Sequence, residues 1–421
     1  MSIMAKALNG KELGKGITQL RNGTYQARVY IKGNDKPIYV SSKRLEEVKQ
    51  KREKILEQYN LGLQTDASKK TLNDWFDEWM ELYVVGKVKP RTVQNYIREY
   101  ERCKSYIGHI KVNQLQPTYI QKMVNELFKK GYKRATVKQS VSVVSQCLEK
   151  AVTIRMILFN PCKGVVLQND SQFTPVNNIE ENDSDRLTDE QIKKFFNAAA
   201  GTRYYELFVI LLNTGMRIGE ACVLEWKDID FEKRSVYIYK TIGTSLIYYD
   251  KYGEKLKEPY YLTQITSPKK EASVRKIPLT ETAIKAFEDW RIKQEKDIKK
   301  LGKKWGKDNV LLKQYPELIF TTQKGNCYMP NVAGKECTRI AQKMNTDEKN
   351  VAESEGREYR YIRVHPHMFR HTFISLCYEA GMDTSVILRI SGHKHIKMMK
   401  YYTHLEENFV NKEFDKIREK M

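Results

Sequence analysis

The 421-residue sequence lacks a long hydrophobic run. Its longest apolar pieces, such as Leu207–Leu212, are far shorter than the roughly 20 residues of a membrane-spanning helix. It also lacks an apolar signal core near its start and any CxxC pair among its seven cysteines. These absences indicate a protein of the reducing cytoplasm, outside membranes, in which each cysteine is a small apolar core residue.

The sequence is also poor in acidic residues relative to basic ones. It contains 74 Lys and Arg against 52 Asp and Glu, which gives a formal net charge of +22. A polyanion fits this excess better than a neutral small substrate does, so nucleic acid is the leading candidate partner. The alternative is a cationic surface that serves only solubility, although a balanced surface would serve that purpose as well.

The length exceeds that of one ordinary core, so we expect two or three domains. Asn-Gly and Gly-Asn turns between residues 16 and 40 predict three short strands, and a helix is expected over residues 44–59. Residues 1–66 have a net charge of +6. A small basic sheet of this kind can enter the major groove of DNA.

Residues 67–169 have the densest positive excess, with a net charge of +10. Apolar residues three or four apart, as at Trp75 and Trp79, predict four or five helices separated at breaks such as Pro90 and Pro117. We expect the exposed face of this bundle to lie against phosphates. An ordinary solvated surface is the alternative.

Residues 168–185 contain five acids and no basic residue, which predicts an extended linker. Thr188 and Gln191 then form the pattern of a capping box that opens a new domain. Within it we expect helices over 204–213 and 218–226, strands over 235–241, 260–266 and 274–278, and helices again after residue 280. Residues 243–262 read as a tyrosine-rich insertion whose role is open.

Six of the seven histidines lie between positions 365 and 404. One interpretation is a metal site built from His365, His367 and His371, and the other is a phosphate site in which imidazoles transfer protons. Arg370 lies one turn from His367 on a helix that Pro366 begins. A fixed cation is unfavourable beside a metal, whereas a guanidinium donates two parallel hydrogen bonds to a phosphate.

A second arginine, Arg217, lies in the stretch TGMRIGE, with Glu220 one turn further on to hold its guanidinium. Alone, it would be interpreted as a structural salt-bridge residue. Downstream, His393 follows a glycine and precedes Tyr402 by nine residues, at the end of a short basic helix. A phenol with a pKa of about 10 needs a base or a cationic surround to act as a nucleophile. The alternative is that Tyr401 and Tyr402 simply pack.

The order and spacing of these residues resemble the active-site set of the tyrosine recombinases. The matching positions are Arg217, the lysine region Lys269–Lys270, His367 with Arg370, His393 and Tyr402. The flanking stretches TGMRIGE, HPHMFRHTF and SGHKHIKMMKYYTH fit as well, and the resemblance covers essentially the whole chain. The N-terminal piece resembles the arm-site-binding domain of phage and conjugative-transposon integrases, and residues 71–166 resemble their helical core-binding domain.

This resemblance implies a multidomain, mainly α fold with small β-sheets. An N-terminal three-stranded sheet plus helix would be followed by a helical core-binding bundle and an α+β tyrosine-recombinase catalytic domain. The boundaries would be 1–66 for the arm-type DNA-binding domain, 67–169 for the bundle, 170–185 for the linker and 186–421 for the catalytic domain.

The resemblance also implies the activity and the partners. It predicts a site-specific DNA recombinase that integrates and excises a mobile element, from a phage or a conjugative transposon, through a 3′-phosphotyrosyl intermediate and a Holliday junction. It would act in the cytoplasm as a homotetramer on double-stranded DNA with core and arm attachment sites. An excisionase and a DNA-bending protein are the accessory partners, and no cofactor, metal ion or membrane is implied.

The implied roles divide between phosphate binding and proton transfer. Arg217 and Arg370 would bind the scissile phosphate and stabilise its pentacoordinate transition state, and His393 would donate a further hydrogen bond. Tyr402 would attack the phosphorus, while His367 accepts or relays the phenolic proton.

The leaving group needs its own proton donor. Lys269 would protonate the 5′-oxygen, with its neighbour Lys270 as the alternative. Three rival functions remain open on the sequence alone: a monomeric type IB topoisomerase-like enzyme, a DNA-binding protein that has lost the reaction, and a metalloenzyme.

Overall fold

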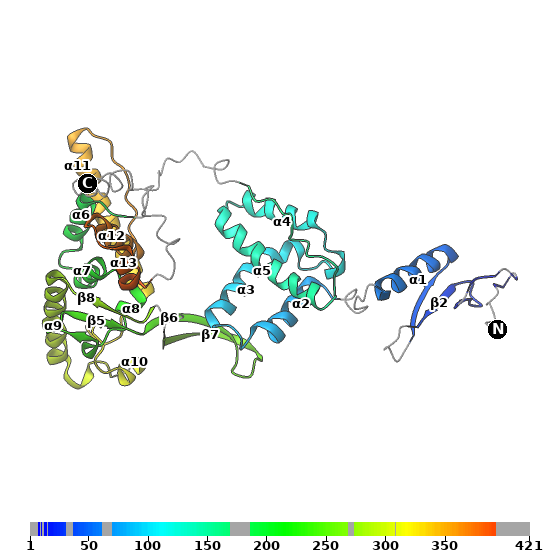
Figure 1. Cartoon of the computed structure of the whole chain (residues 1–421), viewed down its shortest axis with the longest axis horizontal. Helices are drawn as coiled ribbons and strands as arrows, with labels where there is room; N and C mark the ends of the chain where they lie inside the picture. The colour runs from blue at the N-terminus through cyan, green and yellow to red at the C-terminus, as the bar shows by residue number, and fades with distance from the viewer. Residues whose placement is uncertain are drawn as a thin grey trace, which may run out of the picture. The chain divides into compact units, whose positions relative to one another are not determined.

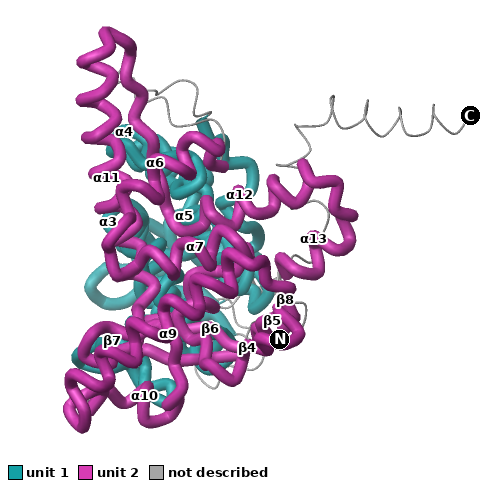
Figure 2. Tube along the Cα trace, turned by 90° about the vertical axis from the view of Figure 1, so that its left-hand side faces the viewer, with its two compact units in different colours: residues 1–175, 245–261 teal, residues 176–244, 262–421 magenta. Residues whose placement is uncertain are grey.

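The chain consists of two compact units, which Figure 2 distinguishes by colour. The computed structural model describes residues 7–8, 10, 12–14, 16–30, 37–60, 70–168, 186–267, 273–307 and 309–392, with the backbone alone at 58–60. The first unit contains residues 1–175 and 245–261, and the second contains residues 176–244 and 262–421. The predicted domain boundaries at residues 66, 169 and 185 stay predictions.

The N-terminal part of the first unit is an antiparallel sheet with one helix (Figure 1). Its elements are β1 (Ile17–Gln19), β2 (Tyr25–Val29), β3 (Ile38–Ser42) and α1 (Leu45–Asn60). The central strand is β2, and Ile17 of β1 lies opposite Ala27 of β2. Both side chains are buried in one cluster with Val48 of α1. The predicted three-stranded sheet and helix are confirmed.

The rest of the first unit is largely a helical bundle. Its helices are α2 (Leu72–Trp79), α3 (Pro90–Ile107), α4 (Pro117–Lys129) and α5 (Arg134–Thr153), with a π-helical turn at Met80–Val84 and a 3₁₀ turn at Val112–Gln114. Proline occupies the first turn of α3 and of α4, where its missing N–H is not needed. The indole N–H of buried Trp75 donates to the carbonyl of Cys147 at 3.1 Å and so joins α2 to α5.

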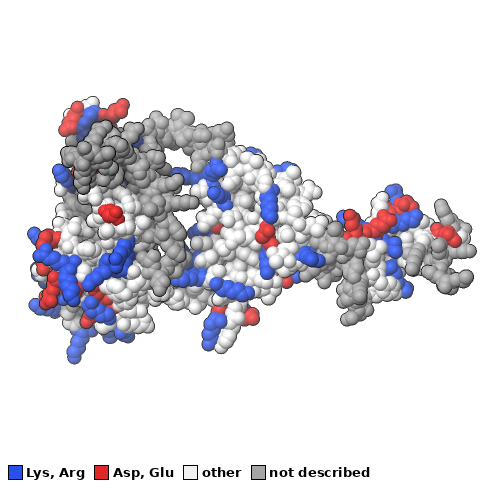
Figure 3. Space-filling model, in the orientation of Figure 1, with Lys and Arg blue, Asp and Glu red and all other residues white. Residues whose placement is uncertain are grey.

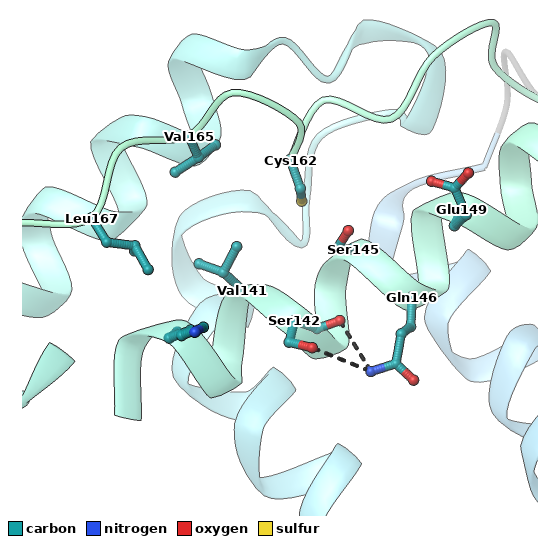
Figure 4. A pocket seen from close by; sticks show the side chains of 9 residues that line it. Val141, Ser142, Ser145, Gln146, Glu149, Cys162, Val165 and Leu167 are labelled. Atoms are coloured by element: carbon teal, nitrogen blue, oxygen red, sulfur yellow. Dashed lines mark hydrogen bonds between the residues drawn. The ribbon is translucent and has the colours of Figure 1, made fainter. Parts of the chain in front are cut away.

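A pocket of about 360 Å³ lies between α5 and residues 162–167 of the first unit (Figure 4). Val141 and Leu167 contribute apolar walls, while Gln146 Nε2 donates to the carbonyl of Ser142 at 3.2 Å. The predicted site residues that the structure describes belong to the second unit. The pocket is therefore no part of the predicted site.

A hairpin of two long strands, β6 (Thr241–Tyr249) and β7 (Lys255–Thr266), includes the predicted insertion at residues 243–262. Its outer part, residues 245–261, belongs to the first unit. There Tyr249 is buried in the apolar cluster of the bundle, and Lys255 Nζ lies 3.3 Å from a carboxylate oxygen of Asp77. The insertion is thus a structured element that packs on helices far away in the sequence.

The second unit is built around α7, a helix that is apolar along most of its length and contacts both α9 and α12. Its helices are α6 (Asp189–Ala199), α7 (Tyr205–Thr214), α8 (Ile218–Ala221), α9 (Glu281–Leu301), α10 (Val310–Gln314), α11 (Pro330–Glu355), α12 (Pro366–Glu379) and α13 (Thr384–Ser391). Its antiparallel sheet, in the order β4-β5-β8, consists of β4 (Ile229–Asp230), β5 (Ser235–Ile238) and β8 (Arg275–Pro278). Short 3₁₀ turns occupy Trp226–Asp228 and Gly302–Lys304.

The start of α6 confirms the predicted capping box. The N–H of Gln191 donates to the Thr188 hydroxyl at 3.2 Å, and the Gln191 side chain accepts from the N–H of Thr188 at 3.0 Å. These two bonds satisfy donors that a helix start otherwise leaves open. The mainly α fold with small sheets is confirmed.

The helix predicted over residues 218–226 is wrong in length, because α8 ends at Ala221. The following residues pair instead with a distant segment: Ile319 N–H donates to the carbonyl of Leu224 at 2.8 Å, and Trp226 N–H donates to that of Glu317 at 3.0 Å. Tertiary pairing therefore overrides local helical preference here.

The seven cysteines are all buried free thiols, as predicted. Burial raises the pKa of each, for example that of Cys337 to about 12, so they stay protonated and unreactive. Within the described ranges, no helix is long and apolar enough to cross a membrane.

Candidate active site

The turn that carries Arg217 follows directly after α7. Gly215 ends the helix in the left-handed conformation, with φ +60°, and a Cβ there would lie 2.3 Å from the ring of Phe373. Only glycine combines this backbone with this close contact. Arg217 then stands at the N-cap of α8, and its side chain is 37% exposed.

Glu220 holds Arg217 in place, as the sequence predicted. One carboxylate oxygen of Glu220 accepts from Arg217 Nη1 at 2.9 Å, and the other accepts from the backbone N–H of Arg217 at 2.9 Å. The exposed part of the guanidinium remains open to solvent. An anion that approaches from that side would meet a cation whose orientation is already fixed.

Glu220 also binds a second arginine, Arg275 of β8. Arg275 Nη1 and Nη2 donate to the two carboxylate oxygens of Glu220 at 3.2 and 2.8 Å, and both side chains are buried. Burial alone would raise the pKa of Glu220, but the hydrogen bonds and charge of Arg275, together with Arg217, outweigh it and lower the pKa. Glu220 is therefore ionised at neutral pH.

Arg275 was not among the predicted site residues. Its Nε also donates to the carbonyl of Ile390 at 2.7 Å, near the end of α13. One buried guanidinium thus connects the Arg217 turn, the strand that follows the lysine region, and the segment that precedes His393. The sequence did contain a signal for Arg275. Residues two apart on a strand point to the same face, so Arg275 shares the buried face of Ile277, while Lys276 between them is exposed.

Arg370 lies on α12 and is almost fully buried, with 1% of its surface exposed. Its Nη1 donates to the carbonyl of Gly215 at 2.8 Å, two residues before Arg217, and its Nη2 donates to the carbonyl of Ser391. The carbonyls of residues 390 and 391 are therefore held by two different guanidinium groups. The structure brings Arg370 and the Arg217 turn together.

His367 lies on the first turn of α12, and Pro366 begins that helix as predicted. Its ring meets that of His371 edge-on, with centroids 4.6 Å apart. Partial loss of water around the imidazole, followed by the nearby charges of His371, Arg370 and Arg217, lowers the pKa of His367 to about 4. Part of the side chain is nevertheless exposed. A neutral imidazole at physiological pH can accept a proton.

The metal interpretation finds no support among the described residues, where no group of three or more His, Cys, Asp or Glu could hold a metal ion. The second unit contains Arg217, His367 and Arg370. Arg217 is held by Glu220, which also binds Arg275, and Arg370 is hydrogen-bonded to Gly215 of the same turn. The other predicted site residues, Lys269, Lys270, His393 and Tyr402, lie outside the described residues. Their roles stay predictions.

This arrangement can be compared with known proteins. A XerC-like tyrosine recombinase of Caldanaerobacter subterraneus subsp. tengcongensis is 28% identical over 406 residues, which cover 93% of this chain and 96% of that protein. The transposase from transposon Tn916 of Enterococcus faecalis is 23% identical over 426 residues, which cover 96% of this chain and 94% of that protein.

Solved structures share the fold. The Tn1549 transposon integrase, in complex with a circular intermediate DNA, matches with a TM-score of 0.64 at 22% identity and covers 83% of this chain and 99% of that one. The lambda integrase tetramer bound to a Holliday junction matches with a TM-score of 0.52 at 16% identity and covers 91% of this chain and 96% of that one.

Two family models match as well. Residues 71–128 match the N-terminal SAM-like domain of phage integrases, and residues 185–408 match the phage integrase family. The second match covers more than half of the chain and includes every predicted catalytic position. The chain therefore belongs to the phage integrase family, whose tyrosine recombinases cleave and rejoin DNA at specific sites.

Proposed function

We propose that the chain integrates and excises a mobile genetic element by breaking and rejoining DNA with Tyr402 as the nucleophile. The observation that carries the proposal is the pair of arginines. The Arg217 turn is hydrogen-bonded to Arg370, and the neutral imidazole of His367 lies on the same turn of α12 as Arg370. Two cations and one base beside each other fit phosphoryl transfer, whereas a metal site would use only the histidines.

The first step exchanges one phosphoester for another. The phenolic oxygen of Tyr402 forms a bond to the scissile phosphorus and gives its proton to His367. The bond from phosphorus to the 5′-oxygen breaks, and Lys269, or its neighbour Lys270, gives that oxygen a proton. Arg217 neutralises the non-bridging oxygens as charge builds on them, and His393 donates a further hydrogen bond. Arg370 takes part in the same step if DNA binding frees its guanidinium from the carbonyls of Gly215 and Ser391.

The product is a 3′-phosphotyrosyl link and a free 5′-hydroxyl. Because the link keeps the energy of the broken phosphodiester, the 5′-hydroxyl of a partner strand can reverse the step without ATP. Exchange of one strand pair produces a Holliday junction, and exchange of the second resolves it. Four copies of the chain, one at each cleaved strand, suffice for both exchanges.

The partners follow from the same chemistry. Double-stranded DNA with core sites for the bundle and the second unit, and arm sites for the N-terminal sheet, accounts for the net charge of +22. The solved tetramer of lambda integrase on a Holliday junction supports the assembly. An excisionase and a DNA-bending protein would set the direction of the reaction, and the enzyme would work in the cytoplasm.

A recombination assay tests this function. Two labelled duplexes that carry the attachment sites, taken from the junctions between the integrated element and its host DNA, are incubated with the chain and a metal chelator. The proposal predicts recombinant products that contain one arm from each duplex. Relaxation of supercoils without exchange between duplexes would instead indicate a topoisomerase-like enzyme, and dependence on added metal would contradict the mechanism.

A further inference from the structure

One end of the second unit carries a concentration of lysines that the proposed reaction does not use. Eight exposed lysines, named here the lysine surface, lie at the end of α9, on α10 and on the turns beside them: Lys296, Lys299, Lys300, Lys303, Lys304, Lys307, Lys313 and Lys324. In Figure 3, Lys and Arg side chains, with Asp and Glu among them, project from the lower left of the molecule, where Figure 1 places α9 and α10.

The backbone beneath the lysine surface is held by a close contact between two glycines. The N–H of Gly306 donates to the carbonyl of Lys324 at 2.8 Å, and a Cβ on Gly325 would lie 2.5 Å from the nitrogen of Gly306. Both glycines have positive φ, +64° and +80°. Asn309 stabilises the same contact, because its Nδ2 donates to the carbonyl of Gly325 at 2.9 Å. These contacts hold together the two backbone segments that carry Lys307 and Lys324.

Two acidic side chains near these lysines are paired with other cations. Asp297 of α9 is paired with Arg203 at 2.5 Å, and Glu206 of α7 is paired with Lys293 of α9, which is not one of the eight. Across the described ranges, none of the eight ammonium groups takes part in an ion pair. Exposed charges of one sign that lie close together produce a field that attracts an anion, so this concentration is suited to an external polyanion.

The lysine surface lies far from the arginines of the candidate active site. α9 begins beside the end of α7, where the Thr280 hydroxyl lies 3.0 Å from the side-chain oxygen of Asn213. It then runs antiparallel to α7, since Lys293 meets Glu206 at the other end. At 1.5 Å per residue, Lys300 lies about 30 Å along the helix from Thr280. An anion bound there cannot be the scissile phosphate.

We propose that the lysine surface binds the phosphate backbone of duplex DNA outside the segment that is cleaved. The inference rests on the proposed function only because that function brings duplex DNA to the chain. Lys296 to Lys303 extend over about 10 Å along the end of α9 and the turn that follows it, the axial length of about three phosphates on one strand of DNA. Lysine offers a mobile point charge rather than a planar fork, which suits contact with phosphates and not readout of bases.

The test compares the affinity of four full-length proteins, the wild type and three variants, for a duplex of about 40 base pairs without an attachment site, as a function of salt. The cluster variant replaces Lys300, Lys303, Lys304 and Lys307 with Gln. The matched control removes the same charge from four exposed lysines scattered over the second unit, through K193Q, K233Q, K285Q and K349Q. Conversion of the four cluster lysines to Arg provides a second control.

The cluster variant is expected to bind about tenfold more weakly at about 0.1 M salt, and its slope of log K against log salt should be smaller by about 2 to 3, because each phosphate contact contributes about 0.9. The scattered control should change the affinity by less than about threefold, and the Arg variant should bind like the wild type. Equal losses in the cluster variant and the scattered control would overturn the proposal.

Two further measurements test whether the lysine surface binds lipid instead of DNA and whether it takes part in the cleavage reaction. Flotation with vesicles of phosphatidylcholine and phosphatidylserine tests a lipid surface, and a loss of vesicle binding without a loss of DNA binding would overturn the choice of DNA. A nicked duplex that carries the attachment site tests the reaction: at saturating protein, the cluster variant should form the covalent adduct in wild-type yield. Failure of the wild type to form it would contradict the proposed function and leave the binding result in place.

Discussion

The two ends of α9 use positive charge in opposite ways. α9 begins beside the end of α7, and around that end Arg275 and Arg370 are buried, with N–H groups that donate to the carboxylate of Glu220 and to backbone carbonyls. Beside its last turn, the lysine surface is exposed and its ammonium groups have no ion pair among the described residues. Buried guanidinium groups fix the positions of other groups, whereas exposed ammonium groups produce a field that tolerates many positions of an anion.

The comparison predicts that a substitution among the buried arginines affects stability most. Arg275→Met would leave the buried carboxylate of Glu220 with Arg217 alone and would release the carbonyl of Ile390. We expect the free energy of unfolding of the second unit to fall by about 3 kcal/mol or more, the usual cost of breaking a buried ion pair. Denaturant unfolding followed by tryptophan fluorescence measures this.

The exposed neighbour of Arg275 provides the matched control. Lys276→Met removes the same charge from the same strand and should change the free energy of unfolding by less than about 0.5 kcal/mol. Similar small losses in both variants would mean that the Arg275–Glu220 pair does not organise the site.

Arg217 should affect the reaction more than the fold. Arg217→Lys keeps the charge beside Glu220 but loses the planar fork, and loss of one donor to a transition-state oxygen costs about 10²- to 10³-fold in rate. We expect that loss in single-turnover cleavage at saturating protein, with DNA affinity within about twofold of the wild type.

A second Arg-to-Lys change shows whether the effect is local. Arg234 pairs with Glu281 at an exposed edge of the same unit, and Arg234→Lys should leave the cleavage rate unchanged. If Arg217→Lys weakened binding and left cleavage of bound DNA intact, Arg217 would be a binding residue only.

The smallest expected effect concerns His367 and pH. The unfolded chain takes up a proton on this imidazole as the pH falls through about 6.5, whereas the folded chain does so only near a pKa of about 4. The stability associated with neutral His367 is therefore complete above about pH 6.5 and declines as the pH falls toward 4. Histidine resonances in NMR, assigned with His367→Gln, should show a midpoint near 4 in the free protein, and a midpoint near 6.5 would contradict the shift.

Local signals in the sequence predicted much of the fold. Pro90, Pro117 and Pro366 each begin a helix, and Thr188 with Gln191 caps another, because these residues act through the backbone of their own turn. The Arg217–Glu220 contact was predictable for the same reason, since both residues belong to one turn.

Features that depend on distant partners were missed or misjudged. The helix expected to reach residue 226 ends early because Leu224 pairs with Ile319, nearly a hundred positions away. Arg275 escaped notice because its partners, Glu220 and Ile390, lie on two other segments. The role of the predicted insertion at residues 243–262 stayed open in the sequence because the helices that bury Tyr249 lie far back in the chain. The local spacing of residues does not show which distant segments will contact each other.

The central claim is that the hydroxyl of Tyr402 breaks the DNA strand, and a suicide substrate nicked near the cleavage point tests it most directly. The short fragment released by cleavage diffuses away, so the covalent complex accumulates and its DNA-linked peptide can be sequenced. The account predicts an adduct on Tyr402 that Tyr401→Phe retains and Tyr402→Phe abolishes. An adduct that persists in Tyr402→Phe, or no adduct in the intact protein, would contradict it.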